Sequence, residues 1–264
     1  MPHAPRVRVI ILAAQRLGVV DPLAAARGLS HKCLVPLAGR PLIAHVLQTI
    51  LQYPGLKDAK VSIEADMMSK IDAIVGDLAA GNNTITCSAA ANNLADSVLA
   101  AAAGHDGPII ITTADNALLS ADAIDAMCAA LSKETDVAIA MTRRASVLAA
   151  HPDGQRRFYR FTDDAYSNCN LYGVGGQRAL AAVEIFRGGG QFAKKVGRII
   201  DAFGLINLLL LRLRLVSLAQ GLRRISKRIG LNVTPVILAD GCNAIDVDNE
   251  RTHKIVEGLI AARG

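Results

Sequence analysis

The 264-residue sequence predicts an α/β fold with a mostly parallel central sheet flanked by helices. Short apolar runs rich in β-branched residues alternate with segments that show helical spacing, which is typical of a parallel sheet covered on both faces. Hydrophobic residues make up 52% of the chain and aromatic residues only 3%, so aliphatic side chains must fill the core. This composition supports a sizeable core and argues against disorder.

The first half of the chain supplies five strands and four helices in alternation. Strands are expected at residues 7–13, 60–64, 84–87, 108–113 and 136–141. Helices are expected at residues 41–51, 69–79 and 94–103, and a fourth is expected to begin near Ser120, whose hydroxyl is a candidate N-cap. Gly39 is expected in a turn conformation that other residues disfavour, and Pro41 at the first helical position after it.

The pattern changes after Thr142. Residues 143–166 are polar and predicted to be loop-rich. Further elements are expected as a strand at 168–174, a helix at 176–186, leucine-rich helical sequence from about 192 to 229, a strand at 232–238, a strand end at "AIDVD" and a closing helix to 262. We predict one domain over residues 1–264, in which the half 143–264 carries a helical insertion at about 188–230.

Composition excludes several classes of protein. The net charge of +6 is too mild and too scattered to indicate nucleic-acid binding. The five cysteines lie far apart without a C-x-x-C pair, so neither a disulfide framework nor a cysteine metal site is expected, and a reducing cytoplasm fits best. The leucine-rich run at 202–222 is interrupted by Arg212 and Arg214, which disfavours a membrane-spanning helix.

Two basic segments lie near the first predicted strand, at the edge where open α/β sheets bind their ligands. Ala13 and Ala14 are small enough to let the backbone approach a ligand, and Arg16 can bind phosphate oxygens with two N–H donors. Lys32 is a compact charge suited to neutralising a phosphate. The alternative for both cations is a position in solvent.

Three aspartates form a candidate metal site. Asp115 directly follows a buried strand, where a carboxylate is costly unless it is paired or bound to a metal, and Mg²⁺ requires such hard oxygen ligands. Asp115 could instead cap the next helix, although Ser120 and Asp122 already supply capping candidates. Asp246 and Asp248 are spaced for one strand face. We expect one of them to join Asp115 on a metal and the other to cap the last helix; which does which stays open.

The segments "ILAAQRLG" and "KCLVPLAGRPLI" together resemble the motifs of the MobA-like nucleotidyltransferases. In that family the first strand ends L-A-[AG]-G-x-x-x-R, and K-x-L-x-P-[LVI]-x-G-[KR]-P-[LM]-[LI] follows. The second motif matches nearly residue for residue, and the resemblance extends to "NNLADSVLAAA", "TTADNALL" and "AIDVD". It implies a Rossmann-like GT-A nucleotidyltransferase fold, with a nucleotide-binding half at 1–142 and an acceptor half at 143–264.

The resemblance also implies an activity and a site. The reaction would be Mg²⁺-dependent transfer of a nucleoside monophosphate from an NTP, with CTP or GTP favoured over ATP, to the phosphate monoester of a sugar, an alditol or a lipid head group, with release of pyrophosphate. A phosphate monoester has its second pKa near about 6 and needs no general base at neutral pH. The implied residues are Arg16, Lys32 and Asp115 for catalysis; Leu12, Ala13, Ala14, Gln15, Asn93, Asp96 and Ser97 for the nucleotide; Asn168, Asn170, Lys194 and Lys195 for the acceptor; and Asp115, Asp246 and Asp248 for the metal.

Two features depart from the family pattern. Gln15 stands where the first loop of the family has glycine, and Arg16 matches the family arginine only if that loop is shortened. The acidic motif is Asp115-Asn116-Ala117 rather than Asp-x-Asp, which gives more weight to Asp246. A GT-A glycosyltransferase that uses a nucleotide sugar, and a degenerate domain that binds nucleotide as a regulator, therefore remain alternatives.

Other segments keep two interpretations. Asn93 and Ser97 could equally cap a helix, and Lys194 and Lys195 could lie on a solvated helix face. The leucine-rich insertion is expected to form core or the interface of a homodimer. Its alternative is peripheral contact with an anionic membrane at the cytoplasmic face, which would suit a lipid-associated acceptor.

Overall fold

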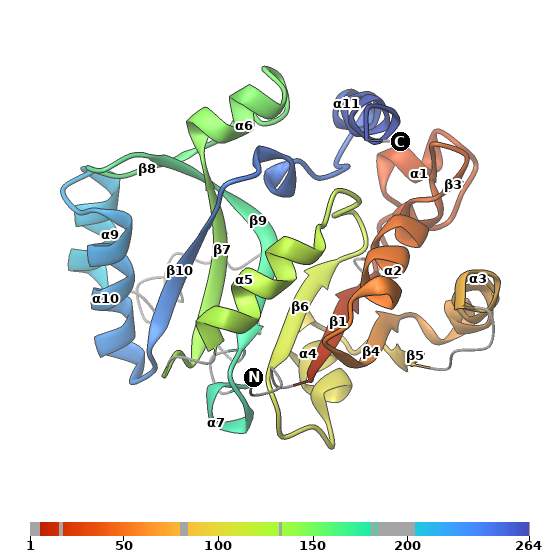
Figure 1. Cartoon of the computed structure of the whole chain (residues 1–264), viewed down its shortest axis with the longest axis horizontal. Helices are drawn as coiled ribbons and strands as arrows, with labels where there is room; N and C mark the ends of the chain where they lie inside the picture. Colours follow the sequence, from red (N-terminus) through yellow and green to blue (C-terminus); the bar gives the residue numbers. More distant parts are fainter. Residues whose placement is uncertain are drawn as a thin grey trace.

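The computed structural model describes residues 6–15, 18–79, 84–131, 134–180, 183 and 204–263. Within this part of the chain, eight strands form one sheet (Figure 1). Seven of them follow one another across it in the order β10 (Val233–Leu238), β7 (Val137–Arg143), β9 (Ala165–Val174), β6 (Ile109–Thr113), β1 (Val7–Leu12), β4 (Leu56–Ile63) and β5 (Ile85–Ala89). The short β8 (Tyr159–Arg160) pairs with β9 alone.

The sheet is mostly parallel, as predicted. β1 pairs in parallel with β4 and β6, β4 with β5, and β7 with β10. β9 is antiparallel to both of its neighbours, β6 and β7. The chain leaves β1 towards β4 and β5 and then returns to β6 on the opposite side of β1. The strand order therefore reverses between β1 and β6, which is where open α/β sheets bind ligands.

Helices cover both faces of the sheet in the described part of the chain (Figure 1). They are α1 (Pro22–Ala25), α2 (Leu42–Gln52), α3 (Met68–Ala79), α4 (Leu94–Ala102), α5 (Ala121–Leu131), α6 (Arg144–Ala150), α7 (Gln177–Leu180), α9 (Leu205–Arg212), α10 (Leu218–Ile229) and α11 (Glu250–Ala261). Three 3₁₀ turns join them: η1 (Lys32–Leu34), η2 (Ala65–Met67) and η5 (Gly241–Ala244).

Alternate residues of β1 show how the two layers arise. Val9 and Ile11 belong to one core with side chains of α2, α3, α5 and α11, whereas Ile10 belongs to a second core with α4 and α7. Successive side chains of a strand point to opposite faces, so the apolar residues of β1 are buried on both faces of the sheet. α10 reaches the second core through Leu222 and Ile229.

The hairpin β2 (Pro36–Leu37) and β3 (Arg40–Pro41) lies between η1 and α2. Its two turn residues, Ala38 and Gly39, have positive φ angles of 47° and 79°, as a two-residue hairpin turn requires. The predicted turn conformation of Gly39 is confirmed. Pro41 occupies the N-cap position of α2, and the first helical residue is Leu42 rather than Pro41 as predicted.

Other elements of the second half differ from the sequence prediction. Residues 144–150 form the helix α6 within the segment predicted as loop. The sequence did not indicate this helix because Val147 is its one buried residue, which leaves the apolar spacing too weak to predict a helix. The "AIDVD" segment follows η5 without strand pairing, so Asp246 and Asp248 do not share a strand face. Of the predicted insertion, residues 204–230 are described and contain two helices, α9 and α10, separated at residues 213–217, whereas residues 188–203 lie outside the described residues. Among the described helices, none has the length and apolar character needed to cross a bilayer.

Candidate active site

A cavity of about 470 Å³ opens at the ends of β1 and β6, at the point where the strand order reverses. The residues after β1, Ala13 to Gln15, form one wall, and those at the end of β6, Thr113 to Asp115, form another. The rest of the lining consists of Leu12, Val19, Asp21, Pro22, Lys32, Cys33, Leu94 and Asp248. The cavity is thus lined by residues from the first 33 positions, from the central strand β6 and from the C-terminal segment.

Lys32 is the cation among the described residues that line this cavity. It lies in η1, and its ammonium group forms ion pairs with the carboxylate of Asp115 and, at 3.4 Å, with that of Asp248. Burial acts to lower the pKa of Lys32, but the charge and hydrogen bond of Asp115, and the charges of Asp248 and Asp21, outweigh it, so the pKa is raised. Lys32 therefore remains a positive charge at neutral pH.

Asp115 is held from two directions. The hydroxyl of Thr113 donates a hydrogen bond to one carboxylate oxygen, and Lys32 binds the other. The backbone N–H of Val247 donates to the backbone carbonyl of Asp115 at 3.1 Å. This last contact ties the "AIDVD" segment to the end of β6. Asp248 lines the cavity, and Asp246 does not line it but lies close enough to Asp115 and Lys32 for their charges to interact.

Asp246 is buried, with 6% of its surface exposed. The amide of Asn170 donates to its Oδ2 at 2.6 Å, whereas Oδ1 has no hydrogen-bond partner among the described residues. Burial and the charges of Asp115 and Asp248 raise the pKa of Asp246 well above its ordinary value of 3.8, against the opposing effects of Lys32 and Asn170. A buried carboxyl oxygen without a partner is costly, which is typical of a group that awaits a ligand.

Asp248 differs from Asp246 in its surroundings. Its side chain is 60% exposed, and its backbone N–H donates to the Thr252 hydroxyl at 2.9 Å. Asn249, and not Asp248, caps α11, since its side chain accepts from the N–H groups of Arg251 and Thr252. The expected capping role therefore falls on the residue next to the aspartates.

The carboxylates suit a metal ion that binds together with the nucleotide better than they suit a metal site formed by protein ligands alone. Within the described ranges, no three His, Cys, Asp or Glu side chains are grouped closely enough to hold a metal ion. Mg²⁺ in nucleotide sites is commonly bound by only one or two carboxylates together with phosphate oxygens. The unpartnered Oδ1 of Asp246 and the carboxylate of Asp115 supply such hard oxygen donors.

The predicted acceptor residues Asn168 and Asn170 lie on β9 beside Asp246. Asn170 has a positive φ of 46°, which asparagine tolerates better than most residues, and a register shift of β9 against β7 lies nearby. Asn168 donates to the Tyr172 hydroxyl and, at 3.4 Å, to Asn170. The side chain of Asn170 thus positions Asp246, a role that the sequence did not indicate.

The predicted nucleotide residues Asn93, Asp96 and Ser97 lie at the start of α4. Asn93 caps this helix by accepting from the Asp96 N–H at 2.9 Å, and Ser97 donates to the Asn93 carbonyl at 2.9 Å. None of the three lines the 470 Å³ cavity, although their neighbour Leu94 does. Capping accounts for their side chains in this structure. Arg16, Lys194 and Lys195 lie outside the described residues.

Gln15 replaces the family glycine with a side chain that braces the loop. Its amide donates to the Ser30 carbonyl at 2.5 Å and accepts from the Asp21 N–H at 3.3 Å. Its own N–H donates to Glu64 at 2.8 Å, and Glu64 contacts His31 at 3.2 Å. The long stretch before Lys32 is therefore fastened to the end of β1. Sequence analysis missed Glu64 and His31, which no local motif marks.

Asn116, the residue after Asp115, is buried to 1% exposure. Its amide donates to the Thr112 hydroxyl and to the Cys169 carbonyl, both at 3.2 Å. It therefore joins β6 to β9 below the cavity. At this point the sequence departs from the Asp-x-Asp motif. Both residues that follow Asp115, Asn116 and Ala117, are buried.

The fold and the cavity define an α/β protein with a cavity at the switch point of a mostly parallel sheet, which is the position where open α/β sheets bind ligands. The MobA-like NTP transferase domain model matches residues 9–194, and the chain belongs to this family of nucleotidyltransferases. No curated protein sequence matches the chain.

Solved structures give the same fold. A hypothetical transferase from Thermus thermophilus aligns with a TM-score of 0.73 at 19% identity, covering 94% of this chain and 99% of that one. The 4-diphosphocytidyl-2C-methyl-D-erythritol synthase of Anaerococcus prevotii aligns with a TM-score of 0.62 at 10% identity, over 98% and 99% of the two chains. A CMP:2-keto-3-deoxy-manno-octonic acid synthetase complexed with CTP aligns at 0.61 and 14% identity, over 98% and 100%. At these identities the likeness shows the GT-A-like fold.

Proposed function

We propose that this protein transfers a nucleoside monophosphate from an NTP to a phosphate monoester and releases pyrophosphate. The observation that carries the proposal is the cluster of Lys32, Asp115 and Asp248 in the lining of the switch-point cavity, with the buried Asp246 beside them. A cation and hard oxygen ligands beside a cavity lined by small residues suit a triphosphate and its metal. Family membership supports the same reaction class.

Each residue has a distinct task in the proposed reaction. Lys32 exchanges its pairing with Asp115 for contact with the triphosphate and neutralises developing charge there. Asp115 and Asp246 would hold Mg²⁺, which would supply Lewis-acid stabilisation of the reacting phosphates. Asn170 keeps the Asp246 carboxyl oriented through its 2.6 Å hydrogen bond. The acceptor is a dianion at neutral pH, so the site needs positioning rather than a general base.

CTP is the nucleotide that we propose to test first, with GTP next. Two structural relatives support CTP: one is named a diphosphocytidyl-methylerythritol synthase, and the other was solved with CTP. The acceptor is proposed by chemical class alone, as the phosphate monoester of a sugar, an alditol or a lipid head group. We place the activity in the cytoplasm, where the reduced cysteines belong.

Pyrophosphate release with each of four NTPs and a panel of phosphate monoesters tests this function. We expect release with one NTP, dependent on both Mg²⁺ and an acceptor, and lost in Asp115→Asn. The matched control is Asp77→Asn, which makes the same change at an exposed position of α3. Nucleotide binding without pyrophosphate release would favour the regulatory domain, and transfer from a nucleotide sugar would favour the glycosyltransferase.

A further inference from the structure

The helix α9 and the turn after it expose apolar side chains that the fold leaves uncovered. Ten large hydrophobic residues are exposed in the described part of the chain, and half of them fall between positions 205 and 215. Each of these five is more than half exposed: Leu205, Ile206, Leu209, Leu213 and Leu215. We refer to these five residues as the α9 patch. Scattered exposed leucines are ordinary, whereas a contiguous group marks an interaction surface.

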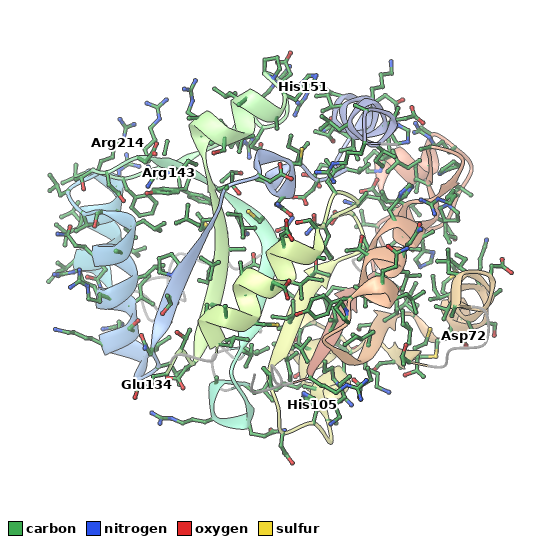
Figure 2. All side chains as sticks on the ribbon, in the orientation of Figure 1. Asp72, His105, Glu134, Arg143, His151 and Arg214 are labelled. Carbon is green, nitrogen blue, oxygen red and sulfur yellow. The ribbon has the colours of Figure 1, made fainter. Side chains whose placement is uncertain are left out.

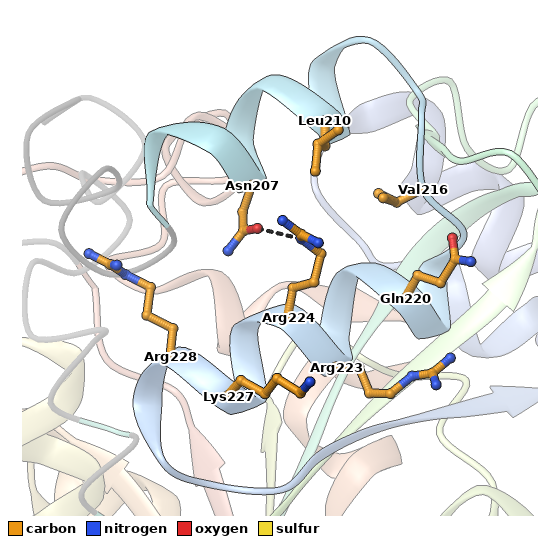
Figure 3. A pocket seen from close by; sticks show the side chains of 8 residues that line it. All are labelled: Asn207, Leu210, Val216, Gln220, Arg223, Arg224, Lys227 and Arg228. Atoms are coloured by element: carbon orange, nitrogen blue, oxygen red, sulfur yellow. Dashed lines mark hydrogen bonds between the residues drawn. The ribbon is translucent and has the colours of Figure 1, made fainter.

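A basic groove of about 940 Å³ lies between α9 and α10 (Figure 3). Its lining comprises Asn207, Leu210, Val216, Gln220, Arg223, Arg224, Lys227 and Arg228. Figure 3 shows the four cations projecting from α10, with Arg224 donating to the side chain of Asn207 at 2.7 Å. We refer to this feature as the α9–α10 groove. It lies directly beside the α9 patch, since α9 contributes to both.

The charge of this region is one-sided. Residues 204–230 contain six arginines and lysines and no aspartate or glutamate. Within the described residues, no carboxylate forms a salt bridge with Arg212, Arg214, Arg223 or Lys227. Figure 2 shows Arg214 at the outer edge of the molecule, near the end of α9. In the described part of the chain, these four charges therefore have no carboxylate partner.

The arrangement of α10 is well determined by its own sequence. Ser217 and Gln220 form a capping box at its start, and Gly230 ends it with a φ of 70°. Leu222 and Ile229 pack against the second core, under the sheet edge formed by β10. The opposite side of the helix carries the cations of the groove, so the basic surface is presented by a rigid element.

We propose that the α9 patch and the α9–α10 groove dock on the surface of an anionic phospholipid membrane. The leucines of the patch would enter the interface between head groups and acyl chains, and the cations would meet lipid phosphates. Charge complementarity selects this occupant over a second copy of the chain. A two-fold contact through the same surface would bring two sets of cations together, and residues 204–230 contain no aspartate or glutamate to compensate them.

The docking surface is distinct from the proposed reaction. None of the residues of the switch-point cavity belongs to the patch or to the groove. Membrane binding and turnover can therefore be measured separately, and either can fail without the other. If both hold, the surface concentrates the enzyme where a lipid-borne phosphate would be found.

Vesicle flotation of the full-length protein tests the proposal. The probes are vesicles of phosphatidylcholine alone and vesicles of phosphatidylcholine with phosphatidylglycerol. We expect the protein to float with the anionic vesicles at low salt, to stay behind with the neutral ones, and to be released progressively as salt is raised. Absence of binding to anionic vesicles at low salt would overturn the proposal.

Two variants locate the contact. Arg223→Gln combined with Lys227→Gln should reduce partitioning to anionic vesicles by about tenfold or more, at roughly 1 kcal/mol per cation. Lys70→Gln combined with Lys254→Gln removes the same charge from exposed positions of α3 and α11 and should leave partitioning nearly unchanged. Equal losses of vesicle partitioning in the two double variants would mean that net charge alone drives binding, and they would reject this surface as the docking site.

The apolar half of the contact is tested with Leu205→Gln combined with Ile206→Gln, at two exposed positions. We expect weaker vesicle binding with unchanged thermal unfolding. Sedimentation of the same variant addresses the competing occupant. If the wild type is a dimer that this variant dissociates, and vesicles bind neither protein, the surface belongs to a second copy and the membrane proposal is wrong.

Discussion

Asp246→Asn is expected to produce a more stable and inactive protein. The substitution keeps the shape of the side chain, and the new amide oxygen can still accept the hydrogen bond from Asn170. It removes a carboxyl group that the fold buries and leaves with one oxygen unpartnered. If that carboxyl group serves as a metal ligand, turnover should be lost while the fold gains stability, as is common where a functional group strains its surroundings.

The size of the gain depends on pH in a defined direction. Burial, with Asp115 and Asp248, raises the pKa of Asp246 in the folded protein above the ordinary value of 3.8 that applies to the unfolded chain. The folded state therefore binds this proton more tightly, and the free energy of unfolding falls as pH rises from 3.8 to the raised pKa. The slope is about 1.4 kcal/mol per pH unit, or about 3–5 °C per unit for a chain of this size. Asn does not titrate, so the variant lacks this loss.

Thermal unfolding of both proteins in EDTA, from acidic to mildly alkaline pH, measures the effect. We expect the melting temperature of Asp246→Asn to exceed that of the wild type by a margin that widens with pH and then becomes constant. Asp77→Asn, at an exposed position, should show no such margin. Parallel pH profiles for the wild type and Asp246→Asn would refute the reasoning, because they would mean that Asp246 titrates normally in the folded protein.

Three further outcomes are expected. Asp115→Asn should lose turnover by several orders of magnitude, at a few kcal/mol of lost charge stabilisation, with unchanged melting; near-normal activity in Mg²⁺ would displace it from the site. Lys32→Ala should lower kcat/KM by roughly 10²-fold, and rates equal to those of the wild type would exclude it. Gly241→Ala should destabilise by about 1–3 kcal/mol or more, because its Cβ would lie 2.0 Å from the Ser146 carbonyl oxygen. Gly258→Ala, in open space on α11, should instead stabilise by about 0.5–1 kcal/mol; similar melting of the two glycine variants would contradict the packing of η5 against α6.

The strands and helices of the first half could be predicted because their signals are local. β1 is a buried run that is aliphatic except for Arg8, β6 begins with three buried isoleucines, and α2 and α4 follow clear turn or capping residues. The Lys32 loop and Asp115 could be placed at the same sheet edge because carboxyl ends of parallel strands meet there. Boundaries differ by a few residues; β4, for example, begins at Leu56 and not at Lys60.

The inner arrangement of the site could not be predicted from the sequence. The partner of Asp246 is Asn170, 76 residues away along the chain, on a strand whose register against β7 shifts nearby. The brace between Gln15 and Glu64 spans 49 residues and matches no short motif. Such contacts arise from tertiary packing, and neither secondary-structure propensity nor motif spacing carries information about contacts between distant segments.

The position of β9 has a consequence for how the protein is made. β9 pairs with β6 and β7, both of which leave the ribosome before it, so the edge of β6 stays open until residue 174 has been synthesised. An open apolar strand edge is a template for pairing with other chains, and a sheet completed by such distant segments folds slowly. Asp246 emerges later still, and its hydrogen bond with Asn170 forms only when β9 is in place. A nascent chain can therefore assemble the β1 and β6 walls of the cavity early, yet it gains its last carboxylate only near the end of translation.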